Sequence, residues 1–251
     1  ANLYYNPLCE DLPRTGAVPV VVLHADTLHR DVEGALPRQE VDRRENFIRK
    51  NVKRAQRIQT ISEFSRTQIE HHYLESAGKV FVTHLPIQNR FAKWGKSREP
   101  LIEGDYFLYP ANFWAHKNHG FLLKVFRDYV TNSSNQAWKL VLTGNDETAA
   151  QHFMQQVENM GMSDRIKFLG HVAEGDYIAL LENAGALVFP STYEGFGIPP
   201  LEAMACGVPV ICSDAGSLPE IVKDGAHIVA TNHEEAWVNA LIKIKETPKY
   251  K

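Results

Sequence analysis

Short apolar runs alternate along this chain with longer segments in which apolar residues recur every three to four positions. Runs of the first kind are typical of buried strands, and segments of the second kind are typical of amphipathic helices. In residues 39–57, for example, Ile48, Val52 and Ala55 share one helical face. The pattern predicts strands at residues 18–23, 58–61, 80–83, 106–109, 139–142, 166–169, 186–189 and 210–212, and helices at residues 39–57, 63–76, 119–130, 148–160, 176–184, 199–206 and 234–245.

This alternation predicts the fold class α/β, with parallel sheets that carry helices on both faces. The stretch 87–104 interrupts it, because it is polar and has no clean period, which indicates a linker. We therefore expect a short, incomplete parallel-sheet domain at residues 1–86, a linker at 87–104 and a nearly complete parallel-sheet domain at 105–251.

Composition excludes several classes of protein. The chain is 44% hydrophobic and 23% charged with a net charge of −3, so no basic field points to nucleic acid. Its three cysteines, Cys9, Cys206 and Cys212, lack metal-ligand spacing, which favours a reducing, cytoplasmic setting. No apolar run approaches the roughly 18 residues of a membrane span, and no signal-peptide pattern opens the chain.

Ligands of parallel sheets bind beyond the carboxyl ends of the strands. That rule selects the loops at 24–26, 109–118, 143–146, 170–175, 190–197 and 213–220. The dinucleotide fingerprint G-x-G-x-x-G is absent after the first predicted strand, which disfavours a nicotinamide enzyme.

The segment "PSTYEGFGIPPLEAMACGVPV" contains the most unusual of these loops. Gly195 and Gly197 permit positive φ and leave room at the main chain, and two prolines fit the first turn of the following helix. Free N–H groups and the positive end of the helix dipole then favour an anion or a polar ligand. Glu194 could instead cap this helix, but capping does not require paired glycines, so we favour the ligand site.

The longer segment "FPSTYEGFGIPPLEAMACGVPVICSDAGSLPEIV" resembles the donor-binding region of glycosyltransferase family 4, with Glu194 and Glu202 as its E-x(7)-E pair. The segments "TISEFSR", "YPANFWAHKNHGFLLKVF", "LVLTG" and "IKFLGHV" follow the order of the same family. The resemblance implies a GT-B fold, in which the C-terminal of two Rossmann-like domains holds a nucleotide-sugar. It also implies that the chain is truncated at both ends relative to a complete member.

The resemblance assigns roles to individual residues. Glu202 is expected to bind the ribose hydroxyls, Glu194 a hydroxyl of the transferred sugar, and Lys117 the diphosphate. His24 matches the histidine that faces the donor sugar, so the catalytic set is Glu194, Lys117 and His24. The expected donor-binding set is completed by Gly195, Phe196, Gly197, Ile198, Leu201, Asn112, Gly144, Gly170, His171 and Val172.

Two positions depart from the family pattern. Asn112 stands where an arginine often lies beside the diphosphate, and Arg66 is a candidate substitute for the missing charge. Ala25 follows His24 where the family has Asp, with Asp26 one place later. The chain has no Asp-x-Asp carboxylate pair, so neither a metal nor another cofactor is expected.

We therefore expect a hexosyltransferase that moves a hexose from a UDP- or GDP-sugar to a saccharide or lipid-linked acceptor, with retention, in surface polysaccharide biosynthesis. One alternative is a nucleotide-sugar-binding module without transfer activity, and a weaker one is an epimerase of GT-B fold. Without the resemblance, Lys117 would be a solvated lysine, His24 a structural histidine, and Phe113 and Trp114 packing residues. The basic run 43–54 indicates either peripheral contact with the inner face of a membrane or, as we favour, a solvated helix face.

Overall fold

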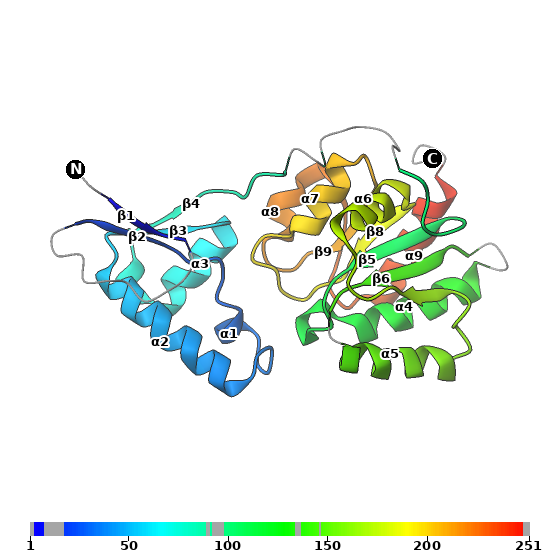
Figure 1. The fold of residues 1–251 in the computed structure, drawn as a ribbon, viewed down its shortest axis with the longest axis horizontal. Helices are drawn as coiled ribbons and strands as arrows, with labels where there is room; N and C mark the ends of the chain where they lie inside the picture. Colours follow the sequence, from blue (N-terminus) through cyan, green and yellow to red (C-terminus); the bar gives the residue numbers. More distant parts are fainter. Residues whose placement is uncertain are drawn as a thin grey trace. The chain divides into compact units, whose positions relative to one another are not determined.

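The computed structural model describes residues 3–7, 18–88, 91, 98–133, 137–145 and 147–247 of the 251-residue chain. Cys9 lies outside these ranges, as do residues 89, 90 and 92–97 of the expected linker. The chain divides into two compact units, drawn in Figure 1. The first comprises Ala1–Pro86 with Tyr193–Phe196, and the second comprises Ile87–Thr192 with Gly197–Lys251.

The first unit contains a parallel sheet in the order β1-β2-β3-β4 within the described residues. Its helices α2 and α3 cover one face of the sheet (Figure 1). The apolar side chains on that face, among them Ile48, Val52, Ile58 and Ile69, form one buried cluster. The elements are β1 (Tyr4–Asn6), β2 (Val20–Leu23), α1 (Leu28–Asp31), α2 (Arg38–Arg54), β3 (Arg57–Thr60), α3 (Glu63–His72) and β4 (Val80–Val82).

The second unit contains a parallel sheet in the order β10-β9-β8-β5-β6-β7. Helices α4 and α5 lie along one face of this sheet, and α6, α7 and α8 lie along the other (Figure 1). The elements are β5 (Tyr106–Pro110), α4 (His119–Asn132), β6 (Lys139–Thr143), α5 (Glu147–Asn159), β7 (Ile166–Phe168), α6 (Glu174–Asn183), β8 (Ala186–Phe189), α7 (Ile198–Ala205), β9 (Val210–Ser213), α8 (Leu218–Val222), β10 (His227–Val229) and α9 (Glu234–Glu246).

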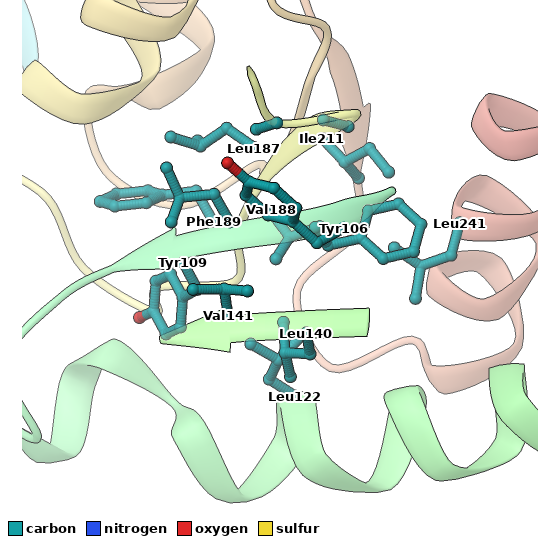
Figure 2. Close-up of a cluster of buried hydrophobic side chains, with 14 of the residues drawn as sticks. Tyr106, Tyr109, Leu122, Leu140, Val141, Leu187, Val188, Phe189, Ile211 and Leu241 are labelled. Carbon is teal, nitrogen blue, oxygen red and sulfur yellow. The ribbon is translucent and has the colours of Figure 1, made fainter. Parts of the chain in front are cut away.

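The core of the second unit is built on the central strands, which are apolar on both faces because helices cover both sides of the sheet. Figure 2 shows Leu140 and Leu122 meeting between β6 and α4, and Val188 and Ile211 on neighbouring strands. Burying one such side chain stabilises the fold by roughly 1.5–3 kcal/mol. Phe91 and Ile102, from the stretch expected to be a linker, belong to this same core.

The predicted strands and helices are all present, with ends shifted by a few residues. The largest difference is the helix expected at 63–76, which ends at His72 and is followed by a separate 3₁₀ turn at Leu74–Ser76. Among the strands and α-helices of the described residues, the sequence pattern did not predict β1, α1, α8 and β10. Within the described residues, no helix is both long and apolar enough to cross a membrane.

Candidate functional site

A pocket of about 440 Å³ opens in the second unit beyond the ends of β5, β6 and β7. Three of the loops selected from the sequence form its wall, as expected for the carboxyl edge of a parallel sheet. Among the lining residues are five predicted members of the donor site: Asn112, Lys117, Gly144, His171 and Val172.

Hydrogen bonds fix these three loops to one another. The Gly144 N–H donates to the Gly170 carbonyl at 2.9 Å, and the Asn145 N–H donates to Oδ1 of Asn112 at 2.8 Å. Gly144 has a φ of +153°, and a Cβ at this position would lie 2.3 Å from the Ala111 carbonyl oxygen. Only glycine fits such a close approach of two loops. Asn112 therefore holds the neighbouring loop in place, using the side-chain oxygen that an arginine would lack.

Lys117 supplies a positive charge to the pocket. It ends the 3₁₀ turn Ala115–Lys117, and its carbonyl accepts a hydrogen bond from the Tyr109 hydroxyl. Its ammonium lies 5.4 Å from the centroid of the Phe189 ring, within cation–π range. The Thr192 N–H donates to the His116 carbonyl at 2.7 Å, which ties the turn to the loop after β8. The lysine thus projects from a backbone that is held on two sides.

The two histidines beside Lys117 do not add to this charge at neutral pH. Burial, aided by the Lys117 charge, lowers the pKa of His116 to about 4. Burial also lowers the pKa of His119 to about 4, against the effect of a hydrogen bond to the backbone of Ala111. The His119 ring stacks on Phe113 at 4.1 Å between centroids, so Phe113 has the packing role of the alternative interpretation. Trp114 does not have that role, because it is 44% exposed and lines the pocket.

Glu202 lies on α7 and is connected to the pocket through a hydrogen bond with a pocket residue, Tyr177. The Tyr177 hydroxyl, from α6, donates to its Oε2 at 2.6 Å, and Tyr177 lines the pocket. Helix α7 starts after Gly197, whose φ of +98° only glycine adopts easily and whose missing side chain leaves room for Leu218. The N-cap of α7 is therefore Gly197, three residues after Glu194.

Glu194 itself belongs to the segment Tyr193–Phe196, which packs within the first unit. The Gly195 carbonyl accepts a hydrogen bond from the Ser62 hydroxyl at 2.7 Å. Gly195 does not adopt the positive φ that we expected, and a Cβ there would instead crowd Asp26. Phe196 is buried, with its ring 5.9 Å from that of His84.

His24 also lies in the first unit, at the end of β2. Its ring packs edge-on against Phe47, and its Nε2 is buried and has no hydrogen-bond partner among the described residues. Burial, together with the nearby His29, lowers its pKa to about 4, so the ring is neutral at physiological pH. His24 lines a cavity of about 270 Å³ with Asp26, Arg43 and Arg44.

The remaining predicted residues lie around these features. Ile198 is 47% exposed and Leu201 is half-buried, both on α7. Arg66, the candidate substitute for the missing arginine, pairs with Glu63 at 2.7 Å on the surface of α3. Sequence reasoning missed Tyr177 and Glu174 as pocket residues, although Glu174 lies within the selected loop at 170–175 and Tyr177 follows that loop by two residues. No group of three or more metal-ligating side chains occurs among the described residues.

Comparison with known proteins identifies the family. The family model described as "Glycosyl transferases group 1" matches residues 93–251. The O-antigen chain mannosyltransferase RfbU of Salmonella typhimurium is 31% identical over 205 residues, covering 80% of this chain and 54% of that protein. The O-antigen chain mannosyltransferase B of Escherichia coli is 30% identical over 221 residues, covering 80% and 58%. The chain thus spans little more than half of each relative.

Solved structures show the same fold at low sequence identity. WaaG, a glycosyltransferase involved in lipopolysaccharide biosynthesis, superposes with a TM-score of 0.74 at 16% identity, covering 99% of this chain and 69% of that one. HepE of Anabaena, solved in complex with UDP and glucose, has a TM-score of 0.72 at 18% identity, covering 93% and 63%. With its family match over more than half its length, this chain belongs to the group 1 glycosyltransferases, glycosyltransferase family 4, and has their GT-B fold.

Proposed function

We propose that this protein transfers a hexose from a UDP- or GDP-sugar to a saccharide or lipid-linked acceptor, with retention of the anomeric configuration. The observation that carries the proposal is the pocket of the second unit, at the carboxyl edge of the sheet. Lys117 lines this pocket, and Tyr177, which also lines it, bonds to the Glu202 carboxylate of α7. A nucleoside diphosphate needs both, because its phosphates require positive charge and its ribose diol requires an acceptor.

On the donor side, the Lys117 ammonium is proposed to neutralise the departing diphosphate. Fixed charges and N–H dipoles can stabilise such a leaving group in place of a metal. The N-terminus of α7 contributes the positive end of its helix dipole and the N–H group of Ile198, whereas Pro199 and Pro200 have no N–H to donate. Glu202 is proposed to accept both ribose hydroxyls, with the His171–Val172 segment beside the base.

Glu194 and His24 are proposed to handle the transferred sugar. Glu194 would accept from one of its hydroxyls, and the main-chain N–H groups of Phe196 and Gly197 would donate to neighbouring oxygens. The neutral His24 imidazole, whose Nε2 has no partner in the part of the chain that the structure describes, is proposed to bond a further hydroxyl. The relatives are O-antigen mannosyltransferases, which supports mannose as the hexose and surface polysaccharide synthesis as the setting.

Asn112 supports a second candidate function, a module that binds nucleotide-sugar without transferring it. Asn112 stands where the family often has an arginine. It is neutral, and its side-chain oxygen accepts a hydrogen bond from the Asn145 N–H. One charge fewer at the diphosphate weakens stabilisation of the leaving group more than it weakens ground-state binding.

The basic run 43–54, for which contact with a membrane surface was the alternative interpretation, lies on α2. The arginines of α2 pair with acidic residues of the same helix: Arg43 and Arg44 with Glu40, and Arg49 with Glu45. Such pairing is typical of a solvated helix face. Sedimentation with vesicles containing anionic lipid would test for membrane contact directly, and no pelleting above that with neutral vesicles would dismiss it.

The central test is a thermal-shift panel of UDP, GDP, ADP and their sugars, since a ligand that binds only the folded state raises the melting temperature. Stabilisation by UDP or GDP and their sugars, beyond that given by ADP, supports the donor site. Slow release of free hexose from the stabilising donor then separates the enzyme from the binding module. Repeating both measurements in EDTA tests the expected independence from metal. Absence of any nucleotide-dependent shift would contradict the proposal.

A further inference from the structure

Tyr177 and Glu202 are joined across two helices that do not follow one another in the chain. The hydroxyl of Tyr177, in the first turn of α6, donates to Oε2 of Glu202 on α7 at 2.6 Å. An ionised carboxylate only accepts hydrogen bonds, so the direction of this bond is fixed by chemistry. The distance is in the range of a strong, charge-assisted O–H···O bond.

The Tyr177 ring is itself held in place. It packs against the core of the second unit and meets the Phe91 ring edge-on, with centroids 6.2 Å apart. The residue also lies in a regular turn of helix, with its N–H bonded to the Ala173 carbonyl at 2.9 Å. The hydroxyl is therefore a fixed donor, whereas the Glu202 side chain has three rotatable bonds of its own.

A carboxylate can accept several hydrogen bonds at once, so the bond from Tyr177 to Oε2 is compatible with others. The two oxygens of a carboxylate suit a pair of neighbouring hydroxyl groups such as the diol of a ribose. Because Glu202 already holds one rotamer, a ligand need not order it on binding, which increases affinity.

We propose that Tyr177 is a positioning residue that presents the Glu202 carboxylate to the ribose of the nucleotide. The inference rests on the proposed function, because it takes Glu202 as the ribose acceptor. Tyr177 reaches the ligand through Glu202, so its hydroxyl affects recognition of the ribose diol and not the bond that is broken.

The variant Tyr177→Phe keeps the ring and removes only the hydroxyl. Affinities for UDP and dUDP, and for GDP and dGDP, are measured by calorimetry on the wild type and on the variant. The wild type should prefer the ribonucleotide, and the preference should fall roughly three- to tenfold in the variant. With a donor sugar, KM should rise by a similar factor while kcat stays nearly constant.

Tyr106→Phe is a matched control. The Tyr106 hydroxyl donates to the Leu180 carbonyl at 2.6 Å, so its loss disturbs α6 from the core side without touching Glu202. This control should lower the melting temperature and leave the ratio of ribonucleotide to deoxynucleotide affinity unchanged. A general loss of stability affects both affinities by the same factor, so it does not alter their ratio.

Two failures are distinguishable. If the wild type binds none of the four nucleotides, the proposed function is wrong. If the wild type prefers the ribonucleotide and Tyr177→Phe retains the full preference, the proposed function stands and the positioning role of Tyr177 is overturned.

Discussion

The ammonium of Lys117 lies 5.4 Å from the centre of the Phe189 ring. Phe189 is the last residue of β8, the strand that precedes the E-x(7)-E segment. The ring face attracts the cation and limits the directions that the side chain can take. The charge of the pocket is therefore held near one wall, where an anionic group can approach it from the open side.

Replacing Lys117 by Gln should weaken binding of the nucleoside diphosphate. Loss of a charge-assisted hydrogen bond to phosphate costs about 1.5–3 kcal/mol, or roughly a 10- to 100-fold rise in Kd. Calorimetric titration with UDP and GDP measures the change. Lys124→Gln, at an exposed position of α4, is the matched control and should leave Kd unaltered. Equal affinities in the two variants would remove Lys117 from the diphosphate site.

Glu202→Ala should weaken binding of every nucleotide donor, because the ribose is common to all of them. The expected loss is on the order of 1.5–3 kcal/mol of binding free energy. Glu235→Ala, exposed on α9, serves as the comparison. An unchanged affinity of Glu202→Ala for the bare nucleoside diphosphate would exclude Glu202 from the site.

Glu194→Ala should separate binding from transfer. If Glu194 holds the sugar, affinity for the bare nucleoside diphosphate stays near the wild-type value while transfer or donor hydrolysis falls much further. If Glu194 serves only the local fold, the variant loses stability and keeps its turnover per folded molecule. Melting temperature, nucleotide affinity and turnover measured on one preparation distinguish these outcomes.

The buried histidines predict that stability falls in mild acid. His24, His116 and His119 have folded pKa values near 4, below the value of about 6.5 expected for the unfolded chain. Between these pH values the unfolded chain binds more protons than the folded one. The contribution of these histidines to the free energy of unfolding is therefore fully present above pH 6.5 and is lost as the pH falls toward 4.

Urea unfolding at pH 7.5 and pH 5.0 measures this loss, and His119→Gln should reduce it. The variant is expected to be less stable than the wild type at pH 7.5, because a polar amide replaces a stacked imidazole. The difference between the two pH values should nevertheless be smaller in the variant. A variant with the full wild-type difference would show that His119 does not contribute.

The sequence predicted the central strands because each is a continuous apolar run with helices on both sides. It missed β1 and β10, which lie at the edges of their sheets and have only three residues each. It also missed α8, whose five residues are too few to show a helical period. The helix predicted at 63–76 breaks at Tyr73, which is buried and donates to Glu45, a long-range contact that no local pattern contains.

The pocket loops were predictable for a different reason. A topological rule places ligands at one edge of a parallel sheet, so the strands alone selected the loops that carry Asn112, Gly144 and His171. The rule does not predict which helices pack close enough for their side chains to form hydrogen bonds. Tyr177 and Glu202 are 25 residues apart in the chain, and their bond depends on how α6 and α7 pack on the sheet. Pairings of this kind become visible only in three dimensions.

The close approach at Gly144 has a consequence for how the pocket behaves before any ligand arrives. The amide protons of Gly144 and Asn145 sit in a loop, yet both are bonded to neighbouring loops. In deuterated water they should exchange slowly, like amides inside a sheet, although they lie between β6 and α5 and belong to neither. Because this wall is ordered when the protein folds, a ligand does not bear the entropy cost of ordering it, and association need not wait for these loops to rearrange.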